Sequence, residues 1–248
     1  MSSRPGRQQS TDWPCGLRCL SAWGVLGLSM LVTVAPAAAQ VVTTLPGPYV
    51  VDVRGTTVGI PRGAAFFPAV PQTTQIPSRG FGVDVGAHVY LVQFGPSRLG
   101  VGADLLRARG TSSPGKNATS GSGPNTRPSQ PDVAATVTAV APQVSFNFGS
   151  AEGWSYISGG WGVAQIRSST SAFGLSGTGT GTGVVPAQVV DNGYRPSVNV
   201  GGGARWFTAK HTAFSFDIRF HVVMAGPKGA SDTPGATLVA ASAGISLR

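Results

Sequence analysis

Residues 212–223 read TAFSFDIRFHVV and carry the clearest structural pattern in the chain. Side chains of a β-strand alternate between its two faces. The even-numbered positions are apolar: Phe214, Phe216, Ile218, Phe220 and Val222. The odd-numbered positions between them are polar: Ser215, Asp217, Arg219 and His221. The stretch therefore predicts a strand with one apolar and one polar face.

Seven further segments are also predicted to be strands, each long enough to cross a membrane at a tilt. The eight predicted strands are Tyr49–Val58, Phe81–Phe94, Arg98–Arg109, Thr136–Phe148, Trp154–Arg167, Arg195–Phe207, Thr212–Val223 and Thr237–Leu247. The first four and the sixth repeat the alternation of apolar and polar residues. The fifth does not, and its faces stay open.

The linkers between these strands alternate in length. The short ones are Gly95–Ser97, Gly149–Gly153 and Thr208–His211, and the long ones are Gly59–Gly80, Gly110–Ala135, Ser168–Tyr194 and Met224–Ala236. An even number of antiparallel strands with short turns at one end and long loops at the other is typical of bacterial outer-membrane barrels. We predict an all-β fold, an eight-stranded antiparallel up-and-down transmembrane β-barrel. Alternation alone would also fit a soluble periplasmic β-sandwich, which is the alternative fold.

Aromatic residues favour the barrel because they gather beside the short turns, where a girdle would meet the membrane surface. They are Phe94, Phe146, Phe148, Trp154, Tyr156, Trp206, Phe207, Phe214 and Phe216, with Tyr49 at the same end. Pro142 and Pro196 disagree with regular strands, since proline cannot donate to the ladder, and each needs a bulge or a break. The run Gly201–Gly203 would suit a bend or a close approach of side chains across the interior.

The long linkers differ in composition. Thr111–Pro131 and Ser168–Gly183 are rich in small and polar residues, so we expect mobile connections without a core. Gly59–Gly80 instead carries Phe66 and Phe67, which we expect to fold back onto the rim of the barrel.

The N-terminus has the pattern of an export signal. The first region is basic, with Arg4, Arg7 and Arg18. The next region, Leu20–Val34, is uncharged and mostly apolar, and the small residues Ala37–Ala39 form a cleavage site. We predict a cleaved signal peptide over residues 1–39 and an outer-membrane barrel domain over 40–248, with localisation in the bacterial outer membrane.

Composition agrees with this division. Both cysteines, Cys15 and Cys19, lie in the signal segment, so the remainder can form neither a disulfide nor a thiolate metal site. Charged residues make up only 11% of the chain, and 36 residues are glycine, which argues against a helical globular domain. No stretch of about 18 apolar residues follows Ala39, so no transmembrane helix is expected.

Two strand segments, Gly80–Gly86 and Asn199–Phe207, together with this architecture, resemble the small eight-stranded outer-membrane barrels, the OmpA-like and OmpX-like group. The resemblance covers nearly all of residues 40–248 and implies a closed transmembrane barrel. One departure is the final sequence Ile245–Arg248, because members of this group commonly end in an aromatic residue that the insertion machinery reads.

Polar residues on the inward faces predict what fills the barrel. They are Asp52, Arg54, Asp84, His88, Asp104, Asn199, Arg205, Asp217, Arg219 and His221. An eight-stranded barrel is just wide enough for its side chains, and buried charges are costly unless paired. We therefore predict a structural network of salt bridges and hydrogen bonds that plugs the interior. The alternative is a proton or ion path, which would make the protein a narrow channel or small-solute transporter.

Catalytic chemistry has weaker support. His88 or His221 could serve an outer-membrane lipid-modifying enzyme, but the chain has no nucleophile elbow and no metal-spaced cluster. The repeat Gly177–Gly183 is not a phosphate-binding loop, since no Gly-Lys-Ser/Thr follows it. We expect no enzyme activity, no catalytic or metal site and no cofactor. The predicted role is structural or interactive at the cell surface.

Positive charge concentrates in or beside the long loops. The residues are Arg62, Arg79, Arg107, Arg109, Lys116, Arg127, Arg167, Arg195 and Lys228, opposed by Asp132, Asp191 and Asp232. Besides outer-membrane lipid in general, such a basic collar suits the phosphates of anionic surface lipid. The alternative is an ordinary solvated loop surface. Nucleic acid is not an expected partner.

Overall fold

The structure is a computed structural model of the chain, and it describes residues 47–68, 70, 76–113, 131–150, 152–176, 182–226 and 234–248. These residues lie within one compact unit, Thr43–Arg248. The predicted signal peptide and its cleavage site are outside the described residues, as are Lys116, Arg127, Lys228 and Asp232 of the long linkers. None of the described segments is a helix long and apolar enough to span a membrane.

The described residues form strands joined by turns and loops. The strands are β1 Tyr49–Gly59, β2 Arg79–Phe94, β3 Ser97–Ser112, β4 Val133–Ser150, β5 Gly153–Thr170, β6 Phe173–Ser176, β7 Thr182–Val185, β8 Gln188–Asp191, β9 Arg195–Phe207, β10 Thr212–Val223 and β11 Ala236–Leu247. All but β6, β7 and β8 coincide with predicted strands to within about three residues at each end.

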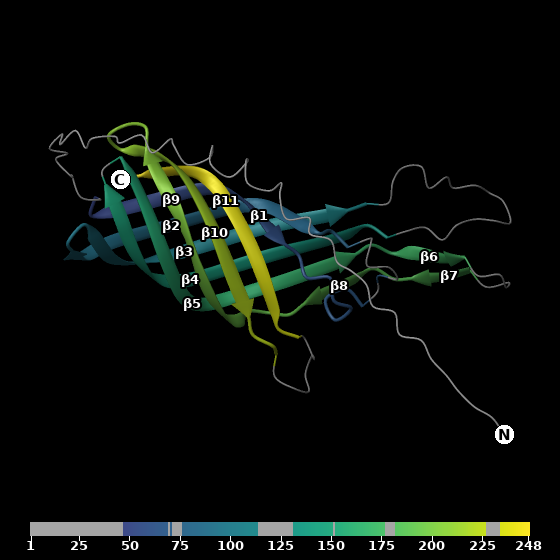
Figure 1. Cartoon of the computed structure of the whole chain (residues 1–248). Coiled ribbons are helices and arrows are strands. Elements are labelled where there is room, and N and C mark those ends of the chain that lie inside the picture. The colour runs from purple at the N-terminus through teal and green to yellow at the C-terminus, as the bar shows by residue number, and fades with distance from the viewer. Residues whose placement is uncertain are drawn as a thin grey trace, which may run out of the picture. The chain divides into compact units, whose positions relative to one another are not determined.

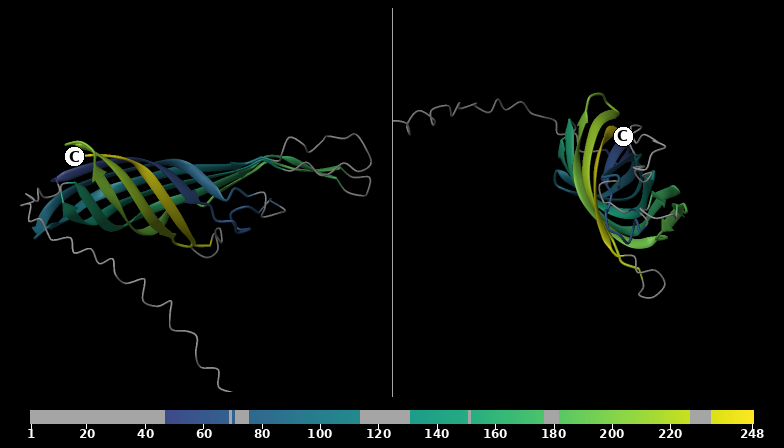
Figure 2. Two further views of the ribbon diagram at one scale, coloured as in Figure 1. Left: turned by 45° about the horizontal axis from the view of Figure 1, so that its top comes forward. Right: turned by 90° about the vertical axis from the view of Figure 1, so that its right-hand side faces the viewer.

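Eight strands close into a barrel (Figure 1). The order runs β1, β2, β3, β4, β5, β9, β10, β11 and back to β1, and every pairing is antiparallel. Figure 2 gives two further views of these strands around a common interior. The predicted eight-stranded antiparallel barrel is confirmed, and the β-sandwich alternative is wrong because the sheet closes on itself.

The long linker Ser168–Tyr194 contains strands, whereas its first part, Ser168–Gly183, was predicted to be a mobile connection. β5 continues to Thr170, and its end pairs with β8, while β6 and β7 form a separate two-stranded sheet. Figure 1 shows that sheet beyond the ends of β4 and β5. Valine pairs on either side of Pro186 have high strand propensity, and this outweighs the neighbouring Gly-Thr repeat, whose centre, 177–181, is outside the described residues.

Neither of the two prolines requires an inserted residue in its strand. β4 stays paired with β3 at Pro142, opposite Ala103, but its pairing with β5 omits Ala141 and Pro142 and resumes at Gln143 in unchanged register. Pro196 is the second residue of β9, where a missing donor disturbs little of the ladder.

The outer and inner faces of the strands follow the predicted alternation. On β10, the apolar residues Phe214, Phe216, Ile218, Phe220 and Val222 face outward. The polar residues Ser215, Asp217, Arg219 and His221 are buried. The alternating stretches of β1, β2, β3, β4 and β9 behave in the same way: their polar residues are buried in the interior, and the apolar residues between them face outward. On β5, the even-numbered residues point inward, with Trp154 and Tyr156 buried, and the odd-numbered Ile157, Trp161 and Val163 face outward.

The predicted aromatic girdle is therefore only partly correct. Tyr49, Phe94, Phe148, Trp206, Phe214 and Phe216 are exposed on the outer face beside the short turns. Trp154 and Tyr156 instead point into the barrel, and Phe207 packs against Trp154. The position beside a turn did not distinguish an outward ring from an inward one, because the faces of β5 could not be assigned from its sequence.

Candidate functional site

The polar interior of the barrel is the candidate site. The structure places all ten residues of the predicted network inside, each with an exposed fraction of 4% or less. They come from five strands: β1 contributes two, β2 two, β3 one, β9 two and β10 three. Because strand alternation aims each of them inward, residues far apart in the sequence meet across the barrel.

Asp52 and Arg205 form the closest ion pair. Arg205 donates from Nε to Oδ1 of Asp52 over 2.8 Å and from Nη2 to Oδ2 over 2.6 Å. The Ser246 hydroxyl also donates to Asp52. Two parallel bonds between a guanidinium and a carboxylate fix both distance and orientation. This pair therefore joins β1 to β9, two strands that are not neighbours in the sheet.

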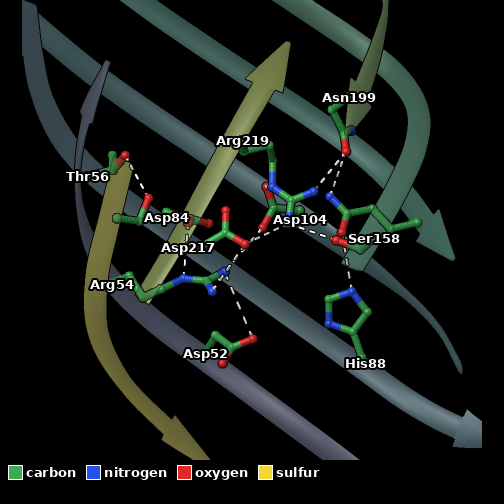
Figure 3. Close-up of polar contacts among 12 residues, drawn as sticks. Asp52, Arg54, Thr56, Asp84, His88, Asp104, Ser158, Asn199, Asp217 and Arg219 are labelled. Carbon is green, nitrogen blue, oxygen red and sulfur yellow. Dashed lines mark hydrogen bonds and ion pairs between the residues drawn. The ribbon is translucent and has the colours of Figure 1, made fainter. Parts of the chain in front are cut away.

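Arg54 lies at the centre of the network (Figure 3). Its guanidinium nitrogens lie 3.1 Å from Asp84, 3.8 Å from Asp104, 3.9 Å from Asp52 and 4.0 Å from Asp217. All four carboxylates of the predicted set are thus within ion-pair distance of one arginine. Gly86 lies beside this cluster, since a Cβ there would lie 3.3 Å from Oδ1 of Asp104 and 3.4 Å from Nη2 of Arg54.

Arg219 connects the carboxylates to the neutral part of the network. Its Nη2 donates to Asp217 over 3.1 Å and to the Ser158 hydroxyl over 2.9 Å, and its Nη1 donates to Oδ1 of Asn199 over 3.0 Å. Its Nε is 3.9 Å from Asp104. Each buried aspartate is therefore near at least one arginine, which offsets the cost of burying the charges.

The two histidines lie at the margin of this network. His88 Nε2 is 3.3 Å from Oε1 of Gln143, and Gln143 in turn donates to Asn199 over 3.1 Å. Neither ring nitrogen of His221 has a hydrogen-bond partner among the described residues. No hydrogen bond in the described part of the chain joins either of these two histidines to a serine hydroxyl.

Sequence reasoning missed Tyr156, which is a central member of the network. Its hydroxyl accepts from Nη1 of Arg54 over 2.6 Å and donates to Oδ2 of Asp217 over 2.7 Å. Its ring lies under Arg205, with Cζ 3.9 Å from the ring centroid. Gly203 lies beside this hydroxyl: a Cβ there would lie 2.0 Å from the Phe216 carbonyl oxygen and 2.8 Å from the Tyr156 hydroxyl oxygen, so a side chain at this position would clash with both.

Apolar side chains fill the interior at the loop end. Phe66 and Phe67, from the connection between β1 and β2, are buried. They belong to a cluster with inward side chains of the barrel: Val58, Leu106, Ala108, Val133, Ala135, Val137, Ala139, Ala164, Ile166, Val223, Leu238 and Ala240, together with Ile60 and Ile76. Ser168 on β5 donates to the Phe66 carbonyl over 2.5 Å. The expected return of this phenylalanine pair to the barrel is confirmed.

Aromatic side chains cover the interior at the short-turn end. Val50, Tyr90 and Trp154 form a buried cluster with Phe207 packed against it. The Arg248 guanidinium lies 3.8 Å from the Phe207 ring centroid and 5.4 Å from that of Trp154. The interior of the barrel thus has three layers, with the charged network between an aromatic layer and an aliphatic one.

Comparison with known proteins gives structural neighbours only. No protein-family model and no curated protein sequence matches the chain. Among solved structures, Neisserial surface protein A is 10% identical, covers 81% of this chain and 97% of its own, and has a TM-score of 0.47.

Two further neighbours are Ail, the attachment invasion locus protein of Yersinia pestis, and the N-terminal β-barrel domain of Pseudomonas aeruginosa OprF. Ail is 9% identical, covers 80% of this chain and 96% of its own, and has a TM-score of 0.41. The OprF domain is 12% identical, with corresponding coverages of 81% and 96% and a TM-score of 0.35. All three neighbours are small eight-stranded outer-membrane barrels, the group that the sequence resembles.

Proposed function

We propose that this chain is a structural and surface-interaction protein of the bacterial outer membrane, whose closed interior conducts neither ions nor small solutes. The outer face of the barrel supports membrane residence. Phe81, Leu91 and Trp161 are exposed by 70%, 69% and 66%, and most other outward strand residues are apolar. Soluble monomers rarely expose apolar surface on this scale, whereas lipid solvates it.

The observation that carries the closed interior is the position of Arg54 within 4.0 Å of four buried carboxylates. A conducting pore would need water beside these charges, yet each is at most 4% exposed. The aliphatic layer around Phe66 and Phe67 and the aromatic layer around Trp154 lie above and below them. Both layers oppose the passage of hydrated ions.

The same contacts support a role without catalysis. The four aspartates are in ion pairs with arginines, His88 contacts an amide, and the described residues contain no group of three or more His, Cys, Asp or Glu side chains suited to a metal ion. We therefore favour binding at the surface over lipid modification. The strands β6, β7 and β8 at the loop end supply surface beyond the barrel wall.

Membrane residence is tested by fractionating Gram-negative cells that express the full chain. The protein should be recovered with the outer membrane, and unboiled samples should migrate differently from boiled samples in a detergent gel. Recovery as a soluble periplasmic protein would contradict the proposal.

Orientation is tested with epitope tags. We propose that the short turns face the periplasm and the long connections face outward. A tag inserted after Glu152, between β4 and β5, should be hidden from antibody on intact cells, whereas a tag between β3 and β4 should be accessible. The opposite result would reverse the orientation.

A further inference from the structure

A groove of about 350 Å³ lies on the outside of the barrel wall at the loop end. Its lining residues are Arg107, Thr136, Thr138, Gln165, Arg167 and Tyr194. The strand register brings them together, since Arg107 pairs with Thr138, Thr138 with Gln165, and Thr136 with Arg167. Arg107 faces outward because it alternates with the buried Leu106 and Ala108.

The groove adjoins the apolar outer wall. Two residues along the same three strands towards the short turns, the outward side chains are Leu105, Val140 and Val163, which are 45%, 41% and 40% exposed. A shift of two residues corresponds to about 7 Å along a strand. In a membrane-embedded barrel, such a change from apolar to polar side chains marks the level where acyl chains give way to headgroups.

The charges of the groove have no carboxylate partner in the part of the chain that the structure describes. Neither Arg107 nor Arg167 makes an ion pair among the described residues, unlike the three arginines of the interior. Asp191 lies across from Arg167 on β8, but its Oδ1 accepts from Gln165 Nε2 over 2.8 Å and from the Gly193 amide over 2.9 Å. No carboxylate is among the lining residues, so the groove is cationic.

We propose that this groove binds the phosphate group of an anionic lipid whose acyl chains lie against Leu105, Val140 and Val163. Two guanidinium groups with threonine hydroxyls beside them match a phosphate, because arginine offers several donors in a planar arrangement. The proposal rests on the proposed membrane residence and identifies, within the basic collar, the residues that contact lipid.

The test uses the folded full chain in zwitterionic detergent micelles, with bound lipid counted by native mass spectrometry. The probes are phosphatidic acid, a diacylglycerol with the same acyl chains, and inorganic phosphate. Wild type should bind one phosphatidic acid more tightly than diacylglycerol. The double variant Arg107→Gln, Arg167→Gln should weaken that binding about tenfold or more, because basic side chains near an anionic lipid surface each strengthen binding several-fold.

The matched control is Arg98→Gln, Lys210→Gln, which removes the same charge at the short-turn end and should bind phosphatidic acid like wild type. If both double variants lost phosphatidic acid binding equally, the attraction would be a general electrostatic one, and the proposal of a site in the groove would be wrong. Displacement of the lipid by an equal concentration of inorganic phosphate would also overturn it, since the site would then recognise free phosphate. A chain with no heat-dependent gel mobility in the same detergent would contradict the proposed function itself.

Discussion

Arg205 on β9 holds Asp52 on β1 across the interior of the barrel through two hydrogen bonds of 2.8 and 2.6 Å. In the sheet, β10 and β11 separate the two strands. The pair therefore acts as a brace between opposite parts of the wall, and both side chains are fully buried.

Removing one member of this brace should destabilise the barrel. Asp52→Ala leaves the Arg205 guanidinium buried without its main partner, which typically costs about 3–5 kcal/mol. In urea unfolding of the protein in detergent micelles, the free energy of unfolding of this variant should be about 3–5 kcal/mol lower than that of the wild type. The double variant Asp52→Ala, Arg205→Met should lose less than the sum of the two single changes. Strict additivity would contradict direct coupling between the two residues.

The Tyr156 hydroxyl should contribute independently of its ring. Tyr156→Phe removes the group that accepts from Arg54 and donates to Asp217, while the ring under Arg205 remains. The free energy of unfolding should fall by about 1–3 kcal/mol, because two buried charged groups, Arg54 and Asp217, each lose a hydrogen-bond partner. The comparison is Tyr194→Phe, which removes an exposed hydroxyl and should be nearly neutral. Equal effects of the two changes would contradict the central position of Tyr156.

Phe66 and Phe67 should stabilise the barrel because their rings are buried in its interior. Phe66→Ala removes a buried ring from the aliphatic layer and should lower the free energy of unfolding by about 3–5 kcal/mol. Phe81→Ala removes a ring that is 70% exposed on the outer wall and should cost much less in the same micelles. A larger loss for Phe81 than for Phe66 would contradict the interior position of the loop.

Alternation of apolar and polar residues explains how much of the fold and of the polar interior could be predicted. On strands such as Thr212–Val223 the alternation determines which face is buried, and the ten inward polar residues follow from it. The fifth strand was ambiguous because Gly159, Gly160 and Gly162 interrupt the pattern between Ser158 and Ala164. Trp154 and Tyr156 were consequently assigned to the outer girdle, and the hydroxyl at the centre of the network was missed.

Contacts across the barrel could not be predicted for a different reason. The partners of Arg54 come from β1, β2, β3 and β10, and the stagger of the strands decides which of them lie at the same height. Sequence alternation gives the face of each residue but not its height. It therefore predicts that four aspartates and three arginines share the interior, and only the structure identifies Arg54 as the residue near all four carboxylates.

Electrical conductance of single barrels shows whether the interior is closed to ions. Purified wild-type protein in a planar lipid bilayer should give no steady current, because paired charges and two apolar layers fill the interior. Arg54→Ala, which leaves four carboxylates without their shared partner, should at most produce brief, flickering openings. A large, stable wild-type current would contradict the closed interior and would favour a channel.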